Sequence, residues 1–380
     1  MVMYMIQSRM KLKKPVKVLL GIVFFILCLL LVLFGYFLIT RSKLNKIGYS
    51  NDAAYNIITS FKQDYAYKYP NNKTLNAAFE SSDFKEENMD IYTKVTYYNH
   101  KHLIRNINLL VDKKYNTRDI SIILAHGTDN DVYEFSKHDK VKYLEEFYSY
   151  DFAKIKNYDR YIAYMDLNGD DEETTIIKVN MDLDRDDYSD PVVVNDYSKT
   201  VIANKHYYLG EGYVPKDLVS FPKEYTLDGD DSCKGTREAV TAAKRMIDAA
   251  KKEGFNLLIN SAYRSYSDQE DVYNTYLKLY GEAYVNSYVV RPGFSEHQTG
   301  YAFDFASGNS NIFANSQEYK WMIKNSYKYG FVYRFLKSKE PITGIKHEAW
   351  HFRYVGEEIA EAMDKGELSF EEYYAIYLDK

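Results

Sequence analysis

Four residues that could do chemistry lie in two short stretches of this chain. His297 and Asp304 belong to SEHQTGYAFD at 295–304, and Glu348 and His351 belong to EAWH at 348–351. Two imidazoles and one carboxylate are a known ligand set for a catalytic Zn²⁺, and they leave the fourth position open for water. Glu348 could act on that water as an acid or a base. The two stretches therefore predict a metallohydrolase with one zinc ion per chain.

The spacing of the first two candidate ligands requires a turn between them. The separation of His297 and Asp304 is an odd number of positions, so a single regular strand would point them to opposite faces. Residues 301–305 alternate as in a strand that carries Asp304. A turn at Gly300 would let His297 fold back over this carboxylate. We therefore expect His297 in the loop that enters the strand.

The third ligand must come from a distant part of the chain, and His351 is the leading candidate. Glu348 lies an odd number of positions before it, so a plain strand would direct the two side chains apart. We expect a turn or a bulge near Ala349 that brings the carboxylate over the water. Glu348 would then take a proton during attack on an amide carbonyl and return it to the leaving amine.

The remaining histidines have no neighbouring ligand pattern. His347 is interpreted as a core histidine or as one that supports a ligand without binding the metal. The other five are expected at the surface, and they are His100, His102, His126, His138 and His206.

Residues 201–380 are predicted to form an α+β domain, with an antiparallel core sheet flanked by helices that carries the zinc site. Ser267 and Glu270 form a candidate capping box for one helix, on which Val272, Tyr276 and Leu279 form a stripe. The expected helices cover 236–253, a segment from 267 and 316–329, and the expected strands cover 255–262, 301–305 and 347–355.

A membrane span is predicted near the N-terminus. Residues 18–39 are apolar and carry no charge. At about 1.5 Å per residue this helix is about 33 Å long, enough to cross a bilayer. A cleaved signal peptide is the alternative, but its apolar region is usually about 7 to 15 residues long. We expect an uncleaved anchor with residues 1–17 in the cytoplasm, because more basic residues precede the span than follow it.

The part of the chain beyond the span is predicted to be acidic. The whole chain has a net charge of −5, and residues 1–46 hold eight basic and no acidic residues, which leaves −13 for residues 47–380. This charge argues against nucleic acid as a partner. Cys28 lies in the span and Cys233 stands alone, so no intramolecular disulfide is expected. Lys- and Asn-rich usage with few cysteines suits a Gram-positive bacterium.

Residues 40–165 are predicted to be a mostly helical extracytoplasmic spacer with a possible two-copy repeat. An Asn-x-Asp-x-Tyr pattern occurs at 88–92 and again at 157–161. Four further positions match at a similar offset, namely Leu44, Tyr49, Ile57 and Ile58 with Leu110, Tyr115, Ile123 and Leu124. Chance similarity in a segment of biased composition is the alternative.

Residues 166–200 are predicted to be a strand-containing connector. Thr174–Met181 (TTIIKVNM) is rich in β-branched residues and is expected to be the strand. Asp166, Asn168 and Asp170 are spaced like the start of a calcium loop, but the glycine and glutamate of such a loop are missing. We expect a solvated turn there.

The combined pattern resembles the VanY-like D-alanyl-D-alanine carboxypeptidases, zinc peptidases that share a fold with lysostaphin-type peptidases and hedgehog. The resemblance covers about residues 201–370. It rests on SxHxxGxAxD at 295–304 and ExWH at 348–351, and it extends to YVPxDLV at 213–219, YRS at 263–265 with Gln269, and WHFRYVG at 350–356. Ala349 departs from the proline that is frequent in the family.

The resemblance implies zinc ligation by His297, Asp304 and His351, with Glu348 as the general base. It also implies that Arg264 lies near the scissile carbonyl, where a fixed cation can stabilise the developing oxyanion. Gln269 and Ser295 match positions that bind the terminal carboxylate and amide of the substrate. Their alternative roles are helix capping and loop hydrogen bonds.

The sequence thus predicts a zinc D,D-carboxypeptidase, anchored in the cell membrane and facing outward, that trims the C-terminal D-alanine from peptidoglycan stem peptides. An L,D-carboxypeptidase and a D,D-dipeptidase are the alternatives within the same chemistry, and pocket width around Arg264, Gln269 and Tyr333 is expected to distinguish them. Two further alternatives are a noncatalytic, zinc-bearing cell-wall binding module and an adaptor role for the N-terminal half.

Overall fold

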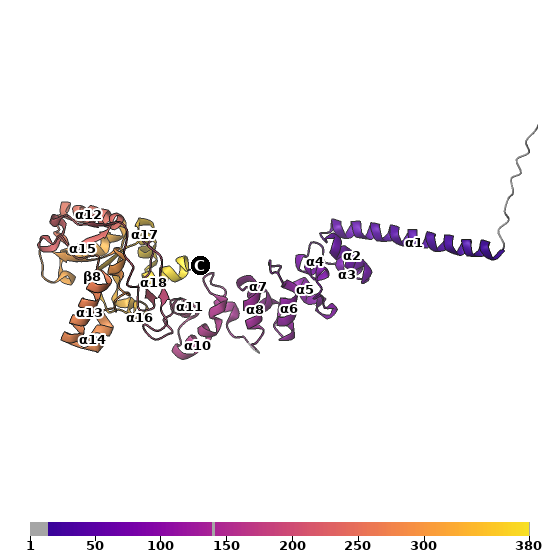
Figure 1. Cartoon of the computed structure of the whole chain (residues 1–380), viewed down its shortest axis with the longest axis horizontal. Coiled ribbons are helices and arrows are strands. Elements are labelled where there is room, and N and C mark those ends of the chain that lie inside the picture. Colours follow the sequence, from indigo (N-terminus) through magenta and orange to yellow (C-terminus); the bar gives the residue numbers. More distant parts are fainter. Residues whose placement is uncertain (1–13, 139–140, 380) are drawn as a thin grey trace, which may run out of the picture. The chain divides into compact units, whose positions relative to one another are not determined.

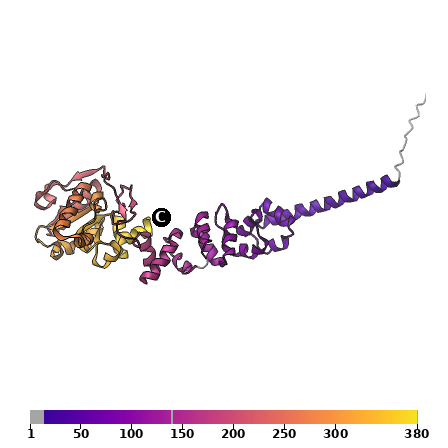
Figure 2. The ribbon, with the colours of Figure 1, turned by 60° about the horizontal axis from the view of Figure 1, so that its bottom comes forward.

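The computed structural model describes residues 14–138 and 141–379. The chain divides into two compact units between Tyr148 and Ser149. Among the described residues the first unit holds only helices, and every strand lies in the second. Both views of the ribbon show this division, with helices alone in the indigo part and strands in the orange part (Figures 1 and 2). The predicted mixture of helices and sheet is confirmed.

The chain begins, within the described residues, with the 33-residue helix α1 (Lys14–Lys46). Its apolar side chains are exposed, and its first buried residues are Thr40 and Leu44, near its C-terminal end. By length and composition α1 is a candidate membrane span, a test that a signal sequence also passes.

Short helices make up the rest of the first unit and the start of the second. They are α2 (Asn51–Thr59), α3 (Gln63–Ala66), α4 (Lys73–Glu80), α5 (Met89–Lys94), α6 (Leu103–Asp112), α7 (Thr117–His126), α8 (Asp129–Phe135) and α9 (Leu144–Phe147), and then α10 (Tyr158–Asn168) and α11 (Glu172–Asn180).

The two Asn-x-Asp-x-Tyr patterns have the same buried hydrogen bonds. The side-chain amide of Asn88 and the hydroxyl of Tyr92 both donate to Oδ1 of Asn108, over 2.8 and 2.7 Å. In the second copy Asn157 and Tyr161 both donate to Oδ1 of Asn180, over 2.9 and 2.6 Å. The sequence separation of the two accepting asparagines, Asn108 and Asn180, is slightly larger than that of the two patterns. A single fixed offset therefore does not align both the patterns and the asparagines. This shared arrangement supports the two-copy repeat, which stays a prediction.

The strand predicted over Thr174–Met181 is wrong, because these residues belong to helix α11 and its C-terminal cap. The side chain of Asp171 accepts a hydrogen bond from the backbone N–H of Thr174 over 2.8 Å and caps this helix. Such a cap stabilises a helix by about 1 kcal/mol. The apolar residues Ile176, Ile177 and Val179 are all buried. Tertiary packing and the N-cap therefore outweigh the strand propensity of the β-branched residues.

A four-stranded sheet forms the centre of the second unit, in the order β5-β6-β8-β7 with every neighbouring pair antiparallel. Its strands are β5 (Leu257–Ser261), β6 (Ala302–Ser307), β7 (Phe331–Phe335) and β8 (Glu348–Tyr354). Two small sheets pair β1 (Val192–Val193) with β2 (Tyr207–Tyr208) and β3 (Leu218–Ser220) with β4 (Lys234–Thr236). The helices of this part are α12 (Arg237–Lys252), α13 (Tyr266–Tyr280), α14 (Glu282–Tyr288), α15 (Gln317–Asn325), α16 (Glu340–Thr343), α17 (Glu357–Gly366) and α18 (Phe370–Tyr373).

The two central strands have a core face and a polar face. Phe303 on β6 is paired with Phe352 on β8, and the next pair is Asp304 with His351. Because side chains alternate along a strand, the two pairs point to opposite faces. The phenylalanines join the hydrophobic core with one face of α12, which confirms the helix predicted there. The core thus fixes the strands that carry two candidate ligands.

The helix α13 begins earlier than predicted. Its capping box is Ser265 with Asp268, and not Ser267 with Glu270. Two overlapping patterns fit the capping rule, and the chain uses the first because the helix starts at Tyr266. The expected stripe is not buried, since Leu279 is 67% exposed. Instead, a row of tyrosines with rings in contact joins α13 to α14, formed by Tyr276, Tyr280, Tyr284 and Tyr288.

Candidate metal centre

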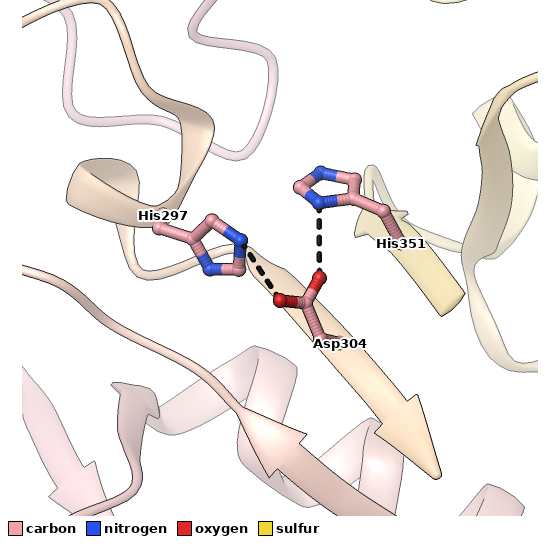
Figure 3. Close-up of side chains that lie close together, drawn as sticks. All are labelled: His297, Asp304 and His351. Carbon is pink, nitrogen blue, oxygen red and sulfur yellow. Dashed lines mark hydrogen bonds and ion pairs between the residues drawn. The ribbon is translucent and has the colours of Figure 1, made fainter. Parts of the chain in front are cut away.

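The structure brings His297, Asp304 and His351 together from three elements (Figure 3). His297 lies in the 3₁₀ turn η5 (Glu296–Thr299), Asp304 lies on β6, and His351 lies on β8 in register with Asp304. One donor atom from each of these buried residues can be chosen so that all three lie within 4.8 Å of one another. Such a group can hold a single metal ion.

The turn expected at Gly300 is present and explains the odd spacing of the first two ligands. Gly300 follows η5 with φ +70°, a left-handed conformation that suits glycine. A side chain at this position would also be crowded, since a Cβ would lie 3.0 Å from a methyl carbon of Leu218. The chain therefore reverses at Gly300, and His297 faces Asp304 across the turn.

The imidazole of His297 presents one nitrogen to the centre. Its Nδ1 lies 2.7 Å from the carbonyl oxygen of Ala262, so Nδ1–H donates to this oxygen. Its Nε2 lies 3.4 Å from Oδ2 of Asp304. Burial lowers the pKa of His297 below its ordinary value. A neutral imidazole with a free Nε2 lone pair is the form that binds a metal.

The imidazole of His351 presents Nδ1 to the centre, whereas His297 presents Nε2. Its Nδ1 lies 3.1 Å from Oδ1 of Asp304, and its Nε2 lies 3.3 Å from Oε2 of Glu296. Burial opposes the charged imidazole, but hydrogen bonds with these two carboxylates raise the pKa of His351 to about 9. Burial likewise favours the neutral form of Asp304, but the attraction of the two imidazoles holds its pKa far below the ordinary value. The carboxylate is therefore ionised and able to act as a ligand.

Glu348 lies beside the three candidate ligands at the start of β8. Its Oε2 is 3.8 Å from Nδ1 of His351. The pairing of β7 with β8 passes from Tyr333 opposite Phe352 to Phe335 opposite Glu348, so β8 is longer than β7 over this stretch. This irregularity is the bulge that the spacing predicts. Burial raises the pKa of Glu348 to about 7.

Arg264, Gln269 and Ser295 line the same cavity as Glu348 and the three candidate ligands. An amino group of Arg264 donates to Oε1 of Gln269 over 2.8 Å, and the amide nitrogen of Gln269 donates to the carbonyl of Val290 over 2.8 Å. Both ends of the Gln269 amide thus have protein partners. Ser295 accepts from the backbone N–H of His297 over 3.3 Å and caps η5. In the structure, Gln269 holds Arg264 and Ser295 holds the turn of His297.

Two expectations about other residues are wrong. Tyr333 does not line the cavity; its hydroxyl contacts Nε2 of His347 and, over 2.9 Å, the hydroxyl of Tyr319. Its apolar body packs on Phe352, which turns it away from the polar face. His206 is buried and not at the surface. It lies directly before β2, in the segment that leads into this strand. Aromatic residues that sequence reasoning did not select line the cavity instead, namely Tyr276, Tyr284, Tyr288, Phe294, Phe335 and Trp350.

Glu296 is the residue of this centre that sequence reasoning missed. It precedes His297 directly and is only 4% exposed. Its Oε1 accepts from Nε of Arg334 over 2.9 Å and from an amino group of Arg353 over 3.2 Å, while its Oε2 faces His351. The only signal in the sequence is that an acidic residue lies beside a candidate ligand. A solvent-exposed glutamate at this position would give the same signal.

The chain is similar to known proteins over part of its length. Residues 233–357 match the family model described as VanY: D-alanyl-D-alanine carboxypeptidase. The chain is 39% identical over 188 residues to the Putative carboxypeptidase YodJ of Bacillus subtilis (strain 168), with 48% of this chain and 69% of that protein covered. It is 30% identical over 164 residues to a D-alanyl-D-alanine carboxypeptidase of Enterococcus faecalis, with 40% and 61% covered, and so spans less than two thirds of that protein.

Solved structures also match about half of this chain. The LdcB LD-carboxypeptidase is 37% identical, with a TM-score of 0.46 and with 49% of this chain and 90% of that chain covered. A mutant of the vancomycin resistance D,D-pentapeptidase VanY, in complex with Zn(II), is 28% identical, with a TM-score of 0.41 and with 47% and 99% covered. The region that matches the family model, residues 233–357, contains η5, β6 and β8, which carry the three candidate ligands.

Proposed function

We propose that this chain, which belongs to the VanY family of D-alanyl-D-alanine carboxypeptidases, is a membrane-anchored zinc D,D-carboxypeptidase that acts on peptidoglycan stem peptides. The observation that carries the proposal is the group of His297, Asp304 and His351 within 4.8 Å, with the carboxylate of Glu348 beside it. The substrate would be a stem peptide that ends in D-alanine, and the product would be that peptide shortened by one D-alanine.

The three donor residues fit Zn²⁺. They supply two imidazole nitrogens and one carboxylate oxygen, a set found in catalytic zinc sites. The nitrogen of each imidazole that does not face Asp304 contacts another oxygen, from Ala262 for His297 and from Glu296 for His351. Such contacts orient ligand histidines in metal sites. When bound, Zn²⁺ would polarise the scissile carbonyl and lower the pKa of a coordinated water towards ~7.

Glu348 would move the proton. Its pKa of about 7, raised by burial, lies near neutral pH, where a general base is most effective. A cation held by the three neighbouring residues would favour the ionised carboxylate, which is the form that accepts a proton. Glu348 would take the proton of the attacking water and pass it to the nitrogen of the leaving D-alanine. One residue thus serves both steps of peptide hydrolysis.

Arg264 would stabilise the negative charge that develops on the carbonyl oxygen. Its guanidinium is held by Gln269 and, over 3.2 Å, by the hydroxyl of Ser261, and its backbone N–H donates to the carbonyl of His297 over 3.2 Å. These contacts fix a cation in the wall of the cavity before substrate arrives. A charge that is already in place needs no reorganisation during the reaction.

We expect Arg264→Lys to lower kcat/KM on a pentapeptide stem mimic by about 10²-fold. Lysine keeps the charge but lacks the planar fork that Gln269 holds. Zinc content should stay equal to that of the unchanged protein, because Arg264 is not among the three donors. Steady-state kinetics with metal analysis checks both points. Arg245→Lys is a matched control, since Arg245 is an exposed arginine paired with Glu357. Unchanged turnover in Arg264→Lys would contradict this role.

The proposed location is the outer face of the cell membrane, with α1 as anchor and the N-terminus in the cytoplasm. Five basic residues precede the apolar segment at 18–39 and three follow it before residue 47. This bias retains the N-terminal side in the cytoplasm. We expect deletion of residues 1–46 to move the protein from the membrane fraction to the soluble fraction. External protease should digest the full chain in intact cells, and full protection would contradict the orientation.

The alternatives differ in the bond that is cut. An L,D-carboxypeptidase would remove D-alanine from a tetrapeptide, and a D,D-dipeptidase would cut free D-alanyl-D-alanine. The LD-carboxypeptidase LdcB is among the similar structures, so both pentapeptide and tetrapeptide must be tested. A noncatalytic binding module would not need Glu348 and Arg264 in the cavity wall beside the three donor residues.

The test uses the full chain, purified in detergent with zinc and incubated with a pentapeptide, a tetrapeptide and the free dipeptide. Mass spectrometry identifies the products. We expect the pentapeptide to lose one D-alanine and a chelator to abolish this loss. Cleavage of only the tetrapeptide would assign the L,D activity, and cleavage of only the dipeptide would assign the dipeptidase. No cleavage despite bound zinc would favour the binding module.

A further inference from the structure

We propose that Glu296 is a positioning residue, which holds the imidazole of His351 so that Nδ1 is presented to the metal. This inference rests on the zinc site of the proposed function. The two ring nitrogens of His351 point in different directions, with Nδ1 at 3.1 Å from Asp304 and Nε2 directed away from Asp304 (Figure 3). Oε2 of Glu296 meets this second nitrogen at 3.3 Å. Glu296 therefore selects the tautomer with hydrogen on Nε2 and a lone pair on Nδ1.

The carboxylate of Glu296 is itself fixed. Its other oxygen accepts hydrogen bonds from Arg334 and Arg353, both of which are fully buried. Arg353 also donates to the carbonyl of Val201 over 2.7 Å, which ties it to a segment outside the sheet. These hydrogen bonds from two buried guanidinium groups hold the carboxylate beside the imidazole. The orientation of His351 is thus set by contacts that reach well beyond the cavity.

The buried group around Glu296 contains two arginines and two glutamates, whose formal charges cancel. Arg334 pairs with Glu371 of α18 as well as with Glu296, through nitrogen–oxygen contacts of 2.8 and 2.5 Å to Glu371. Two arginines therefore face two carboxylates. The carboxylate of Glu296 can only accept in its contact with His351, so the hydrogen between them lies on Nε2 of the imidazole. A negative carboxylate behind a ligand histidine raises the basicity of the nitrogen that faces the metal.

Fold stability alone does not require a buried group of two arginines and two glutamates. Moving several charges out of water is unfavourable, and proteins with apolar residues of similar volume in their place are often as stable or more stable. Phe335 and Phe370 already pack on the guanidinium of Arg334, so the site has an apolar lining. Within this buried group of charges, Glu296 contacts the candidate metal ligand His351.

Glu371 provides a matched control for Glu296. Both are buried carboxylates that contact Arg334, so each glutamine substitution removes one charge from the same arginine. Glu371 also accepts from the side-chain amide of Asn204 over 3.2 Å. Its described hydrogen-bond partners do not include His351. If zinc affinity falls in the Glu296 variant and not in the Glu371 variant, the loss is therefore due to the missing contact with the imidazole of His351.

The experiment compares the unchanged full chain with Glu296→Gln and Glu371→Gln. Zinc affinity is measured by competition with a chromophoric chelator, and the visible spectrum of the Co²⁺-loaded protein reports the geometry around the ion. We expect Glu296→Gln to weaken zinc binding by about 10- to 100-fold and to shift the Co²⁺ spectrum. Glu371→Gln should keep affinity and spectrum, while Tm falls in both variants because each leaves a buried charge with fewer partners.

Glu296→Asp tests the same contact with the charge balance preserved. The shorter side chain stays negative beside the two arginines but withdraws its carboxylate from Nε2, so zinc affinity should fall here too. Unchanged affinity in Glu296→Gln and Glu296→Asp would overturn the inference, and so would an equal loss in Glu371→Gln. If the unchanged protein binds no zinc, the proposed function itself fails, and this result is distinct from the others.

Discussion

Replacing Glu348 by glutamine is expected to lower kcat on the pentapeptide stem mimic by about 10²- to 10⁴-fold, the range that general acid–base catalysis supplies. Glutamine keeps the size of the side chain but accepts no proton from the attacking water. Zinc content should not change, because the three donor atoms come from other residues. Rates from mass spectrometry, together with metal analysis of the same samples, measure both quantities.

The control for this variant is Glu340→Gln. Glu340 is another glutamate of the segment that leads into β8, but it pairs with Lys346 over 2.8 Å and does not line the cavity. Its substitution should leave kcat unchanged. A Glu348→Gln protein with more than about a tenth of the normal rate would be incompatible with a contribution of this size and would remove Glu348 from its role.

Replacing His351 by alanine is expected to abolish zinc binding and turnover together. The substitution removes one of three protein ligands and leaves Asp304 without its 3.1 Å contact to Nδ1. Zinc affinity should fall by more than the ~10- to 100-fold that loss of a supporting contact causes. Chelator competition gives the affinity, and the peptide assay at saturating zinc gives the rate.

His347→Ala is the matched control on the same segment. Nε2 of His347 contacts the hydroxyl of Tyr333, which lies outside the cavity. This variant should therefore keep zinc and turnover, with at most a lower Tm. If His351→Ala bound zinc like the unchanged protein, or if His347→Ala lost the ion, the assignment of the third ligand would be wrong.

The candidate donor residues could be chosen from the sequence because their chemistry is restrictive. Few residue types bind zinc, and the odd separation of His297 and Asp304 left a turn at Gly300 as the simple way to bring them together. The same argument placed a bulge beside Glu348, and the strand pairing contains one. Residue type and spacing were sufficient to predict that these residues lie together, because the relevant geometry is local or is fixed by neighbouring strands.

Glu296 shows what residue type and spacing do not reveal. Its importance comes from Arg334, Arg353 and Glu371, which all lie much further along the chain. No periodicity connects these positions, and a glutamate in a polar stretch is usually solvated. Likewise, the aromatic wall of the cavity depends on how α14 packs on α13, which the exposed tyrosines alone do not indicate.

The wrong strand at Thr174–Met181 has a different cause. Its β-branched residues favour a strand locally, but Asp171 caps a helix and the buried face of α11 packs on the core beside α17 and α18. The capping box of α13 illustrates a smaller ambiguity, since Ser265 and Ser267 both fit the rule. In both places tertiary contacts decide between local options of similar free energy.

The most direct test of the metal centre is anomalous diffraction at the zinc absorption edge, on crystals of the full chain purified without chelator. We predict one zinc peak per chain, bonded to Nε2 of His297, to a carboxylate oxygen of Asp304 and to Nδ1 of His351. A peak elsewhere, or coordination through Nε2 of His351, would contradict the account. So would the absence of a zinc peak after soaking with zinc.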